Sequence, residues 1–138
     1  MSNSSYIMER NAELFLRYYE ARKNNPRLTC QQAIEQAVDS PTSRHFVSLV
    51  EVYREILNKL HGREPKHCMK DLRRQQIEDI YHIYCELAAK PTFKGASPFF
   101  IVQFAIAEPA PHFYLSYSRA RDIIWDIKHK YEIEVDES

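Results

Sequence analysis

The sequence predicts an all-α protein of six helices, arranged as two tandem, helix-turn-helix-like repeats of three helices that share one core. Apolar residues recur at helical spacing, in segments that start at capping residues. The chain has only two glycines, which argues against an all-β fold because hairpin turns usually need glycine. The two copies are expected to share a core because an isolated domain of about 50 to 70 residues is only marginally stable.

The evidence for a repeat is an alignment, without gaps, of residues 33–60 with residues 101–128. Both segments contain an apolar helical part, a proline, a connector with basic and aromatic residues, a serine cap and a second helix. We call residues 40–48 the first connector and residues 108–116 the second connector. Four of the 28 aligned pairs are identical, namely Ala37 with Ala105, Pro41 with Pro109, Ser48 with Ser116 and Ile56 with Ile124.

The predicted domain boundaries follow from this repeat. The first repeat covers residues 1–62 and the second covers residues 71–130. Residues 63–70 show no hydrophobic periodicity and are predicted to be a linker. Residues 131–138 contain four carboxylates and are predicted to form an acidic, disordered tail.

The first two helices are predicted from their stripes and boundaries. The first helix covers residues 6–23, and the asparagines and proline at 24–26 end it. Thr29 starts the second helix through a capping box with Gln32, and Pro41 ends it. The expected buried faces are Met8, Ala12, Phe15 and Tyr19 on the first helix, and Ala33, Ile34, Ala37 and Val38 on the second.

The third helix completes the first copy. Ser48 is expected to cap it, with Glu51 at capping-box spacing, and Gly62 supplies a left-handed position at its end. Its expected buried stripe is Val52, Ile56 and Leu60.

The second copy follows the same plan. Asp71 is expected to cap a fourth helix that runs to about residue 89. Ser97 and Pro98 start the fifth helix, residues 99–107, which is apolar nearly all round and is expected to be the centre of the shared core. A buried β-strand is the alternative for so short an apolar run. The sixth helix covers residues 116–130. The expected inward residues are Ile77, Ile80, Tyr81 and Tyr84 on the fourth helix, and Ala120, Ile123, Ile124 and Ile127 on the sixth.

The net charge, the hydrophobic runs and the cysteines indicate which kinds of partner and which cellular compartment to expect. Nineteen basic and nineteen acidic residues give a net charge of zero, so composition gives no indication of a polyanionic partner. No apolar run approaches the roughly 18 residues that a membrane span needs, and the first residues do not resemble a signal peptide. Three unpatterned cysteines suit a reducing compartment. We expect a cytoplasmic protein without a membrane partner.

The sequence contains no recognisable catalytic or metal-binding motif. His61, His67 and Cys68 lie near one another, but their spacing fits no standard zinc site. A nucleophile elbow, a P-loop, a dinucleotide-binding loop and a zinc-protease motif are all missing from the sequence. The sequence therefore predicts no enzyme activity, no cofactor and no metal.

The connectors are the most distinctive chemical feature. Each places basic and aromatic residues directly before a helix N-terminus, where backbone donors favour an anion such as phosphate. Two helices joined by a turn also match the outline of a helix-turn-helix DNA reader, although a turn of about nine residues is longer than that motif uses. The candidate nucleic-acid-binding residues are Arg44, His45, Arg54 and Lys59 in the first copy, and His112, Arg119, Arg121, Lys128 and Lys130 in the second.

Two other interpretations of the connectors stay open. The aromatics could fill the core while the prolines fix the helix crossing. Aligned charges also change sign between the copies, because Glu51 corresponds to Arg119 and Arg54 to Asp122. Either only one copy meets an anionic ligand, or the copies pair through these complementary positions.

The chain resembles a family of small, uncharacterised tandem-repeat helical proteins from gut anaerobic bacteria and their phages or mobile elements. Residues 41–48 carry the resemblance, and residues 109–116 with the helix at 120–128 carry it more closely. The family has Arg or Lys before the aromatic pair, so His112 departs from its pattern. The resemblance implies a bacterial or phage setting and a conserved role for the connector.

Two functions from different classes are consistent with these features. The first is a small DNA-binding accessory or regulatory protein of a bacterial mobile element or phage, with double-stranded DNA as its partner. The alternative is a non-catalytic interaction or structural protein, such as a phage component, that binds a protein partner or itself.

Overall fold

The computed structural model describes residues 4–63 and 69–131, which form six α-helices and a short 3-10 helix, with no β-strand in these ranges. The all-α prediction is confirmed, and the strand alternative for the fifth helix is wrong. The linker residues 64–68 and the tail residues 132–138 lie outside the described residues. The helices are α1 (Ser4–Asn24), α2 (Cys30–Val38), α3 (Leu49–Leu60), α4 (Asp71–Ala88), η1 (Pro91–Phe93), α5 (Pro98–Ile106) and α6 (Tyr117–Lys130).

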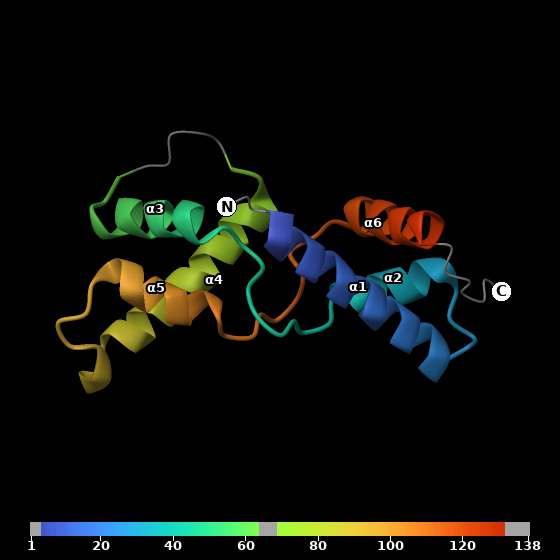
Figure 1. The fold of residues 1–138 in the computed structure, drawn as a ribbon, viewed down its shortest axis with the longest axis horizontal. Helices are drawn as coiled ribbons and strands as arrows, with labels where there is room; N and C mark the ends of the chain where they lie inside the picture. The colour runs from blue at the N-terminus through green and yellow to red at the C-terminus, as the bar shows by residue number, and fades with distance from the viewer. Residues whose placement is uncertain (1–3, 64–68, 132–138) are drawn as a thin grey trace. The chain divides into compact units, whose positions relative to one another are not determined.

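The chain divides into two compact units (Figure 1). Unit 1 comprises Met1–Thr42 and Ala110–Ser138 and holds α1, α2 and α6, whereas unit 2 comprises Ser43–Pro109 and holds α3, α4, η1 and α5. This division differs from the boundaries predicted at residues 62 and 71. The third helix of each predicted copy packs with the first two helices of the other copy: α3 contacts α4 and α5, and α6 contacts α1 and α2.

The connectors allow this exchange because each is nine residues long. Nine residues can span up to roughly 30 Å, enough to leave a unit of three short helices. The connectors run antiparallel at Thr42 and Ala110, where the Thr42 N–H donates to the Ala110 carbonyl at 2.9 Å and the Ala110 N–H donates to Thr42 Oγ1 at 3.3 Å. Thr42 and Ala110 are aligned with each other in the predicted repeat, since 110 − 42 = 68 is also the offset between residues 33 and 101.

A second pair of hydrogen bonds follows the same offset. The His45 N–H donates to the Ile106 carbonyl in unit 2, and the Phe113 N–H donates to the Val38 carbonyl in unit 1, each at 3.0 Å. His45 is aligned with Phe113 and Val38 with Ile106, so the two units contain the same bond. The helix bounds follow the same offset, because α5 (98–106) begins and ends 68 residues after α2 (30–38). The gene duplication itself stays a prediction.

Each unit has its own core, built from helices of both predicted copies. In unit 2 the buried cluster comprises Val47, Val52, Ile56, Ile77, Ile80, Tyr84, Ile101, Val102 and Ala105. In unit 1 the buried apolar residues of the helices are Leu14, Tyr18, Ala21, Ala33, Ile34, Ala37, Val38, Ala120, Ile123 and Ile124. These sets confirm most of the predicted stripes on α2, α3, α4 and α6.

The predicted face of the first helix is wrong. Met8 is 67% exposed and Tyr19 is 42% exposed, whereas Leu14, Tyr18 and Ala21 are buried. Apolar residues surround much of α1, so more than one stripe has helical spacing, and packing against α2 and α6 decides which stripe is buried. On α3, Leu60 is exposed although the spacing placed it on the buried stripe.

The predicted caps are confirmed with two exceptions. Thr29 forms the expected capping box, and Ser48, Ser97 and Ser116 each accept a backbone N–H at a helix start. Ser48 forms only half of its predicted capping box, because the Glu51 side chain pairs with Arg73. Asp71 does not cap α4, because the N-cap is Lys70 and makes no side-chain bond, while Asp71 pairs with Arg74 at 2.9 Å. Ser48, Ser97 and Ser116 themselves have extended backbone dihedrals, and the helix begins at the next residue in each case.

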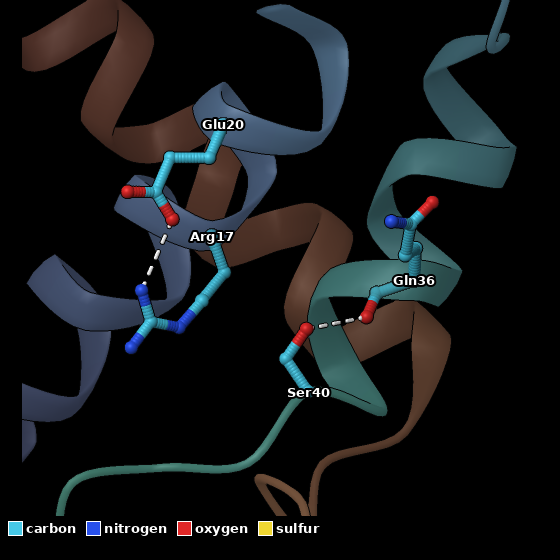
Figure 2. Close-up of polar contacts among 4 residues, drawn as sticks. All are labelled: Arg17, Glu20, Gln36 and Ser40. Carbon is cyan, nitrogen blue, oxygen red and sulfur yellow. Dashed lines mark hydrogen bonds and ion pairs between the residues drawn. The ribbon is translucent and has the colours of Figure 1, made fainter. Parts of the chain in front are cut away.

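The end of α2 shows how a connector begins (Figure 2). Ser40 Oγ donates to the Gln36 carbonyl at 2.8 Å, which satisfies an acceptor in the last turn of the helix. Pro41 follows and prevents further helix. Figure 2 also shows the ion pair of Arg17 with Glu20, one turn apart on α1, at 3.0 Å. This pair lies on the part of α1 that faces solvent.

Replacing Ile56 or Ile124 by alanine tests the equivalence of the two cores. Ile56 is 0% and Ile124 is 2% exposed, and each is aligned with the other. Each change should lower the free energy of unfolding by about 2 to 5 kcal/mol, because it removes buried methylene groups and leaves a cavity. Urea unfolding measures the loss. Leu60→Ala on α3 is the matched control and should cost well under about 1 kcal/mol; equal losses at positions 56 and 60 would contradict the assigned core.

Candidate functional site

The connectors place a basic side chain over a buried aromatic ring in both units. The Arg44 guanidinium lies 4.9 Å from the centroid of the Phe46 ring, and the His112 ring lies 4.1 Å from the Tyr114 ring. Phe46 and Tyr114 are 8% and 7% exposed, so the predicted burial of these aligned aromatics is confirmed. The geometry favours the interpretation in which connector aromatics fill the cores.

His112 has a backbone role that an Arg or Lys could not perform. Tyr114 adopts a left-handed conformation with φ of 57°, which is uncommon for a residue with a large side chain. The Tyr114 N–H donates to His112 Nδ1 at 3.1 Å. An imidazole nitrogen can accept this bond, whereas guanidinium and ammonium groups only donate. His112 therefore supports the left-handed backbone conformation of Tyr114.

His45 lies in the interior of unit 2. Its side chain is 0% exposed, and its Nδ1 lies 3.3 Å from Nε2 of the buried Gln76. The amide nitrogen only donates, so Nδ1 accepts. His45 was a candidate for DNA contact because of its place in the sequence, but a buried side chain cannot touch a phosphate at the surface.

The other first-copy candidates lie in unit 2 and differ in exposure. Arg54 is exposed on α3. Lys59 is half-buried, forms an ion pair with Glu78 of α4 and lies 5.5 Å from the centroid of Tyr81. Glu51, whose charge is reversed at the aligned Arg119, pairs with Arg73 at 3.1 Å within unit 2. Two basic side chains of this unit, Lys59 and Arg73, are therefore already paired with carboxylates.

The second-copy candidates lie on α6 in unit 1. Arg119, Arg121 and Lys130 are exposed, and Arg121 pairs with Asp122 at 3.4 Å. Lys128 is 8% exposed, and its ammonium group donates to the Tyr18 hydroxyl at 3.2 Å. Lys128 is therefore part of the core of unit 1 and not of a DNA-binding surface.

Two basic groups of unit 1 differ in exposure. Arg10 is half-buried on α1, and Arg119 is exposed on α6. Burial lowers the pKa of Arg10, and repulsion from Arg119 lowers it further, while Tyr6 acts in the opposite direction.

The most exposed apolar surface of unit 2 is on α5. Phe99, Phe100 and Phe104 are 38%, 48% and 46% exposed, so the prediction that this helix lies at the centre of a core holds only for Ile101, Val102 and Ala105. Phe93, Phe100 and Phe104 form a contiguous group in which Phe100 lies 5.1 Å and Phe93 lies 5.3 Å from Phe104, measured between ring centroids. Phe99 instead packs edge to face against Tyr53 of α3 at 5.0 Å. We call Phe93, Phe100 and Phe104 the aromatic face.

A pocket of about 300 Å³ lies beside α3 and α4 in unit 2. Its lining carries charges of both signs, and the ion pair of Lys59 with Glu78 forms part of its wall. Arg74, also in the wall, pairs with Asp71 at 2.9 Å. These mixed and paired charges indicate no particular ligand.

A polar cluster in unit 1 was not predicted from the sequence. Cys30 Sγ lies 3.2 Å from Arg22 Nη1 and 3.1 Å from the Tyr18 hydroxyl, which also contacts Lys128. The residues come from α1, α2 and α6, so no local spacing could reveal them. The sequence held one relevant signal, because Cys30 directly follows the capping Thr29 at the start of α2.

No family model, curated protein or solved structure matches this chain. Within residues 4–63 and 69–131, no group of three or more His, Cys, Asp or Glu side chains is placed to hold a metal ion. His67 and Cys68 lie outside the described ranges. None of the helices described is both long and apolar enough to cross a membrane.

Proposed function

We propose that this protein is a non-catalytic binding protein whose aromatic face recognises a segment of another protein. The exposure of Phe100 and Phe104, which contact each other and Phe93, is the observation that supports this function. Exposed aromatic clusters are costly in water and are enriched in the cores of protein interfaces. Large rings that contact each other edge to face also provide a rigid surface, which lowers the entropic cost of binding.

The charge around the aromatic face defines the chemistry of the partner. Residues 87–107 contain Lys90 and Lys94, both exposed, and no Asp or Glu. A partner segment that combines apolar side chains with carboxylates would complement both features, with apolar groups on the rings and carboxylates at the rim. The resemblance to proteins of gut bacteria and their phages or mobile elements is the support for proposing a bacterial cytoplasm or a phage assembly as the setting.

Photo-crosslinking from residue 100 tests this proposal. A photoreactive phenylalanine analogue at Phe100 should trap a distinct protein in the native cells, and the cross-linked peptide should be apolar and acidic. The matched control carries the analogue at Leu16 on α1, which is 48% exposed like Phe100. Changing both Lys90 and Lys94 to Glu should reduce the product about tenfold or more, because two rim charges are reversed.

Three outcomes would contradict the proposal. Equal yields of the same cross-linked product from the analogue at residues 16 and 100 would show that the aromatic face has no selectivity. A yield unaffected by the charge reversal would contradict an acidic partner. A cross-link only to a second copy of this chain would replace the partner protein by self-association.

DNA binding is the second candidate, and the exposure of three basic residues on one helix supports it. Arg119, Arg121 and Lys130 are the exposed candidates on α6. His45 and Lys128 are removed from the candidate surface by burial. A protein of zero net charge binds DNA only through such a local concentration of basic groups.

A duplex-binding titration at several salt concentrations tests this candidate. Three phosphate contacts predict a slope of about −3 when the logarithm of the association constant is plotted against the logarithm of the salt concentration. Arg119→Ala should lower the magnitude of this slope by about one unit. Removing residues 131–138 should strengthen binding, because their carboxylates compete with phosphate. Arg27→Ala, an exposed arginine of the same unit, is the control. No binding at low salt by the intact or truncated chain would exclude DNA as a partner.

A further inference from the structure

A second apolar stripe on α1 faces away from the core of unit 1. Its members recur every three or four residues along the helix, and we call them the outer stripe: Met8, Ala12, Leu16 and Tyr19. At about 100° per residue they lie within roughly 80° of one another, on the side of α1 opposite to its buried residues. Met8, Leu16 and Tyr19 are 67%, 48% and 42% exposed. A helix with two apolar sides is typical of burial on both, so another molecule is expected to cover the outer stripe.

The charges beside the outer stripe are arranged to pair with an antiparallel copy of the same helix. Glu9 lies seven residues before Leu16 and Lys23 lies seven residues after it, and both charged residues are exposed. If two copies of α1 cross antiparallel with a two-fold axis at Leu16, Glu9 of each copy lies opposite Lys23 of the other. The pair then forms twice. A parallel arrangement would instead oppose like charges, which costs free energy.

The sizes of the side chains also suit an antiparallel pair. Ala12 precedes Leu16 by four residues and Tyr19 follows it by three, so the Tyr19 ring of one copy meets the small Ala12 of the other. Large side chains opposite small ones allow two helices to interdigitate. Glu20, at the edge of the outer stripe, is paired with Arg17 of its own helix at 3.0 Å. The net charge of zero adds no overall repulsion between two copies.

We propose that the outer stripe binds a second copy of this chain, as an antiparallel pair of α1 helices with two-fold symmetry. Leu16 lies at the symmetry axis, the rest of the stripe packs around it, and Glu9 pairs with Lys23 at both ends. A contact of about four helical turns is smaller than a standard interface, so the dimer should dissociate reversibly in the micromolar range. The outer stripe belongs to unit 1 and the aromatic face to unit 2, so a photoreactive analogue at Leu16 should cross-link a second copy, a product different from that of residue 100.

Sedimentation velocity of the intact chain under reducing conditions, over a series of concentrations, tests the proposal. A monomer–dimer equilibrium is expected. Leu16→Asp should raise its dissociation constant by about tenfold or more, because two carboxylates would face each other at the symmetry axis. Leu60→Asp on α3 is the matched control, since Leu60 is 43% exposed, and it should leave the dimer unchanged. Helical circular dichroism should stay the same in both variants, because both positions are exposed.

Exchanging the charged pair tests the antiparallel order of the helices. Glu9→Lys and Lys23→Glu should each weaken the dimer several-fold, because each opposes like charges at both ends of the contact. The double variant should restore the affinity, since it exchanges the two charges and keeps the pairing. A chain that stays monomeric at its highest soluble concentration, a dimer that Leu16→Asp does not weaken, or a double variant that binds no tighter than the single ones would overturn the proposal.

Discussion

The backbone hydrogen bonds of the two connectors determine which helices meet in each unit. Thr42, His45 and Phe113 are almost completely buried, and a buried N–H without a partner would be costly. The Thr42 N–H donates to a carbonyl of the second connector. The N–H groups of His45 and Phe113 donate to the carbonyl at the end of the helix that precedes the other connector. These bonds fix the path of each connector, along which α3 reaches α4 and α5, and α6 reaches α1 and α2. The cores, the buried aromatics and the polar cluster of unit 1 all depend on this exchange.

Local features of the fold were predictable because local chemistry determines them. Thr29, Ser48, Ser97 and Ser116 cap their helices as their sequence context indicated, and Gly62 adopts the expected left-handed conformation. The exchange of third helices was not predictable from spacing, because a connector of this length can lead a helix to either unit. The buried face of α1 was wrong for the same reason: its neighbours, and not its own stripe, decide which residues are covered.

The candidate site shows the same limit. Basic residues beside aromatics suggested phosphate contacts, yet Arg44 lies over Phe46, His45 is buried, and His112 supports the backbone of Tyr114. The helix at 99–107 was assigned to the core because an all-round apolar helix is usually buried. Among the described helices of unit 2, α3 and α4 contact α5, and Phe99, Phe100 and Phe104 stay exposed. The Cys30 cluster joins three helices across more than a hundred residues of sequence, beyond any motif.

Methyl nuclear Overhauser effects in the intact chain test the helix exchange most directly. Ile56 on α3 shares a buried cluster with Ile77 and Ile80 of α4 and Val102 of α5. The exchange predicts effects between the Ile56 methyl groups and those of Ile77, Ile80 or Val102, and effects from Ile124 to Leu14 or Ile34 in unit 1. Effects from Ile56 to Leu14 and Ile34 instead, with none to α4 or α5, would show that each repeat keeps its own third helix and would contradict the exchange.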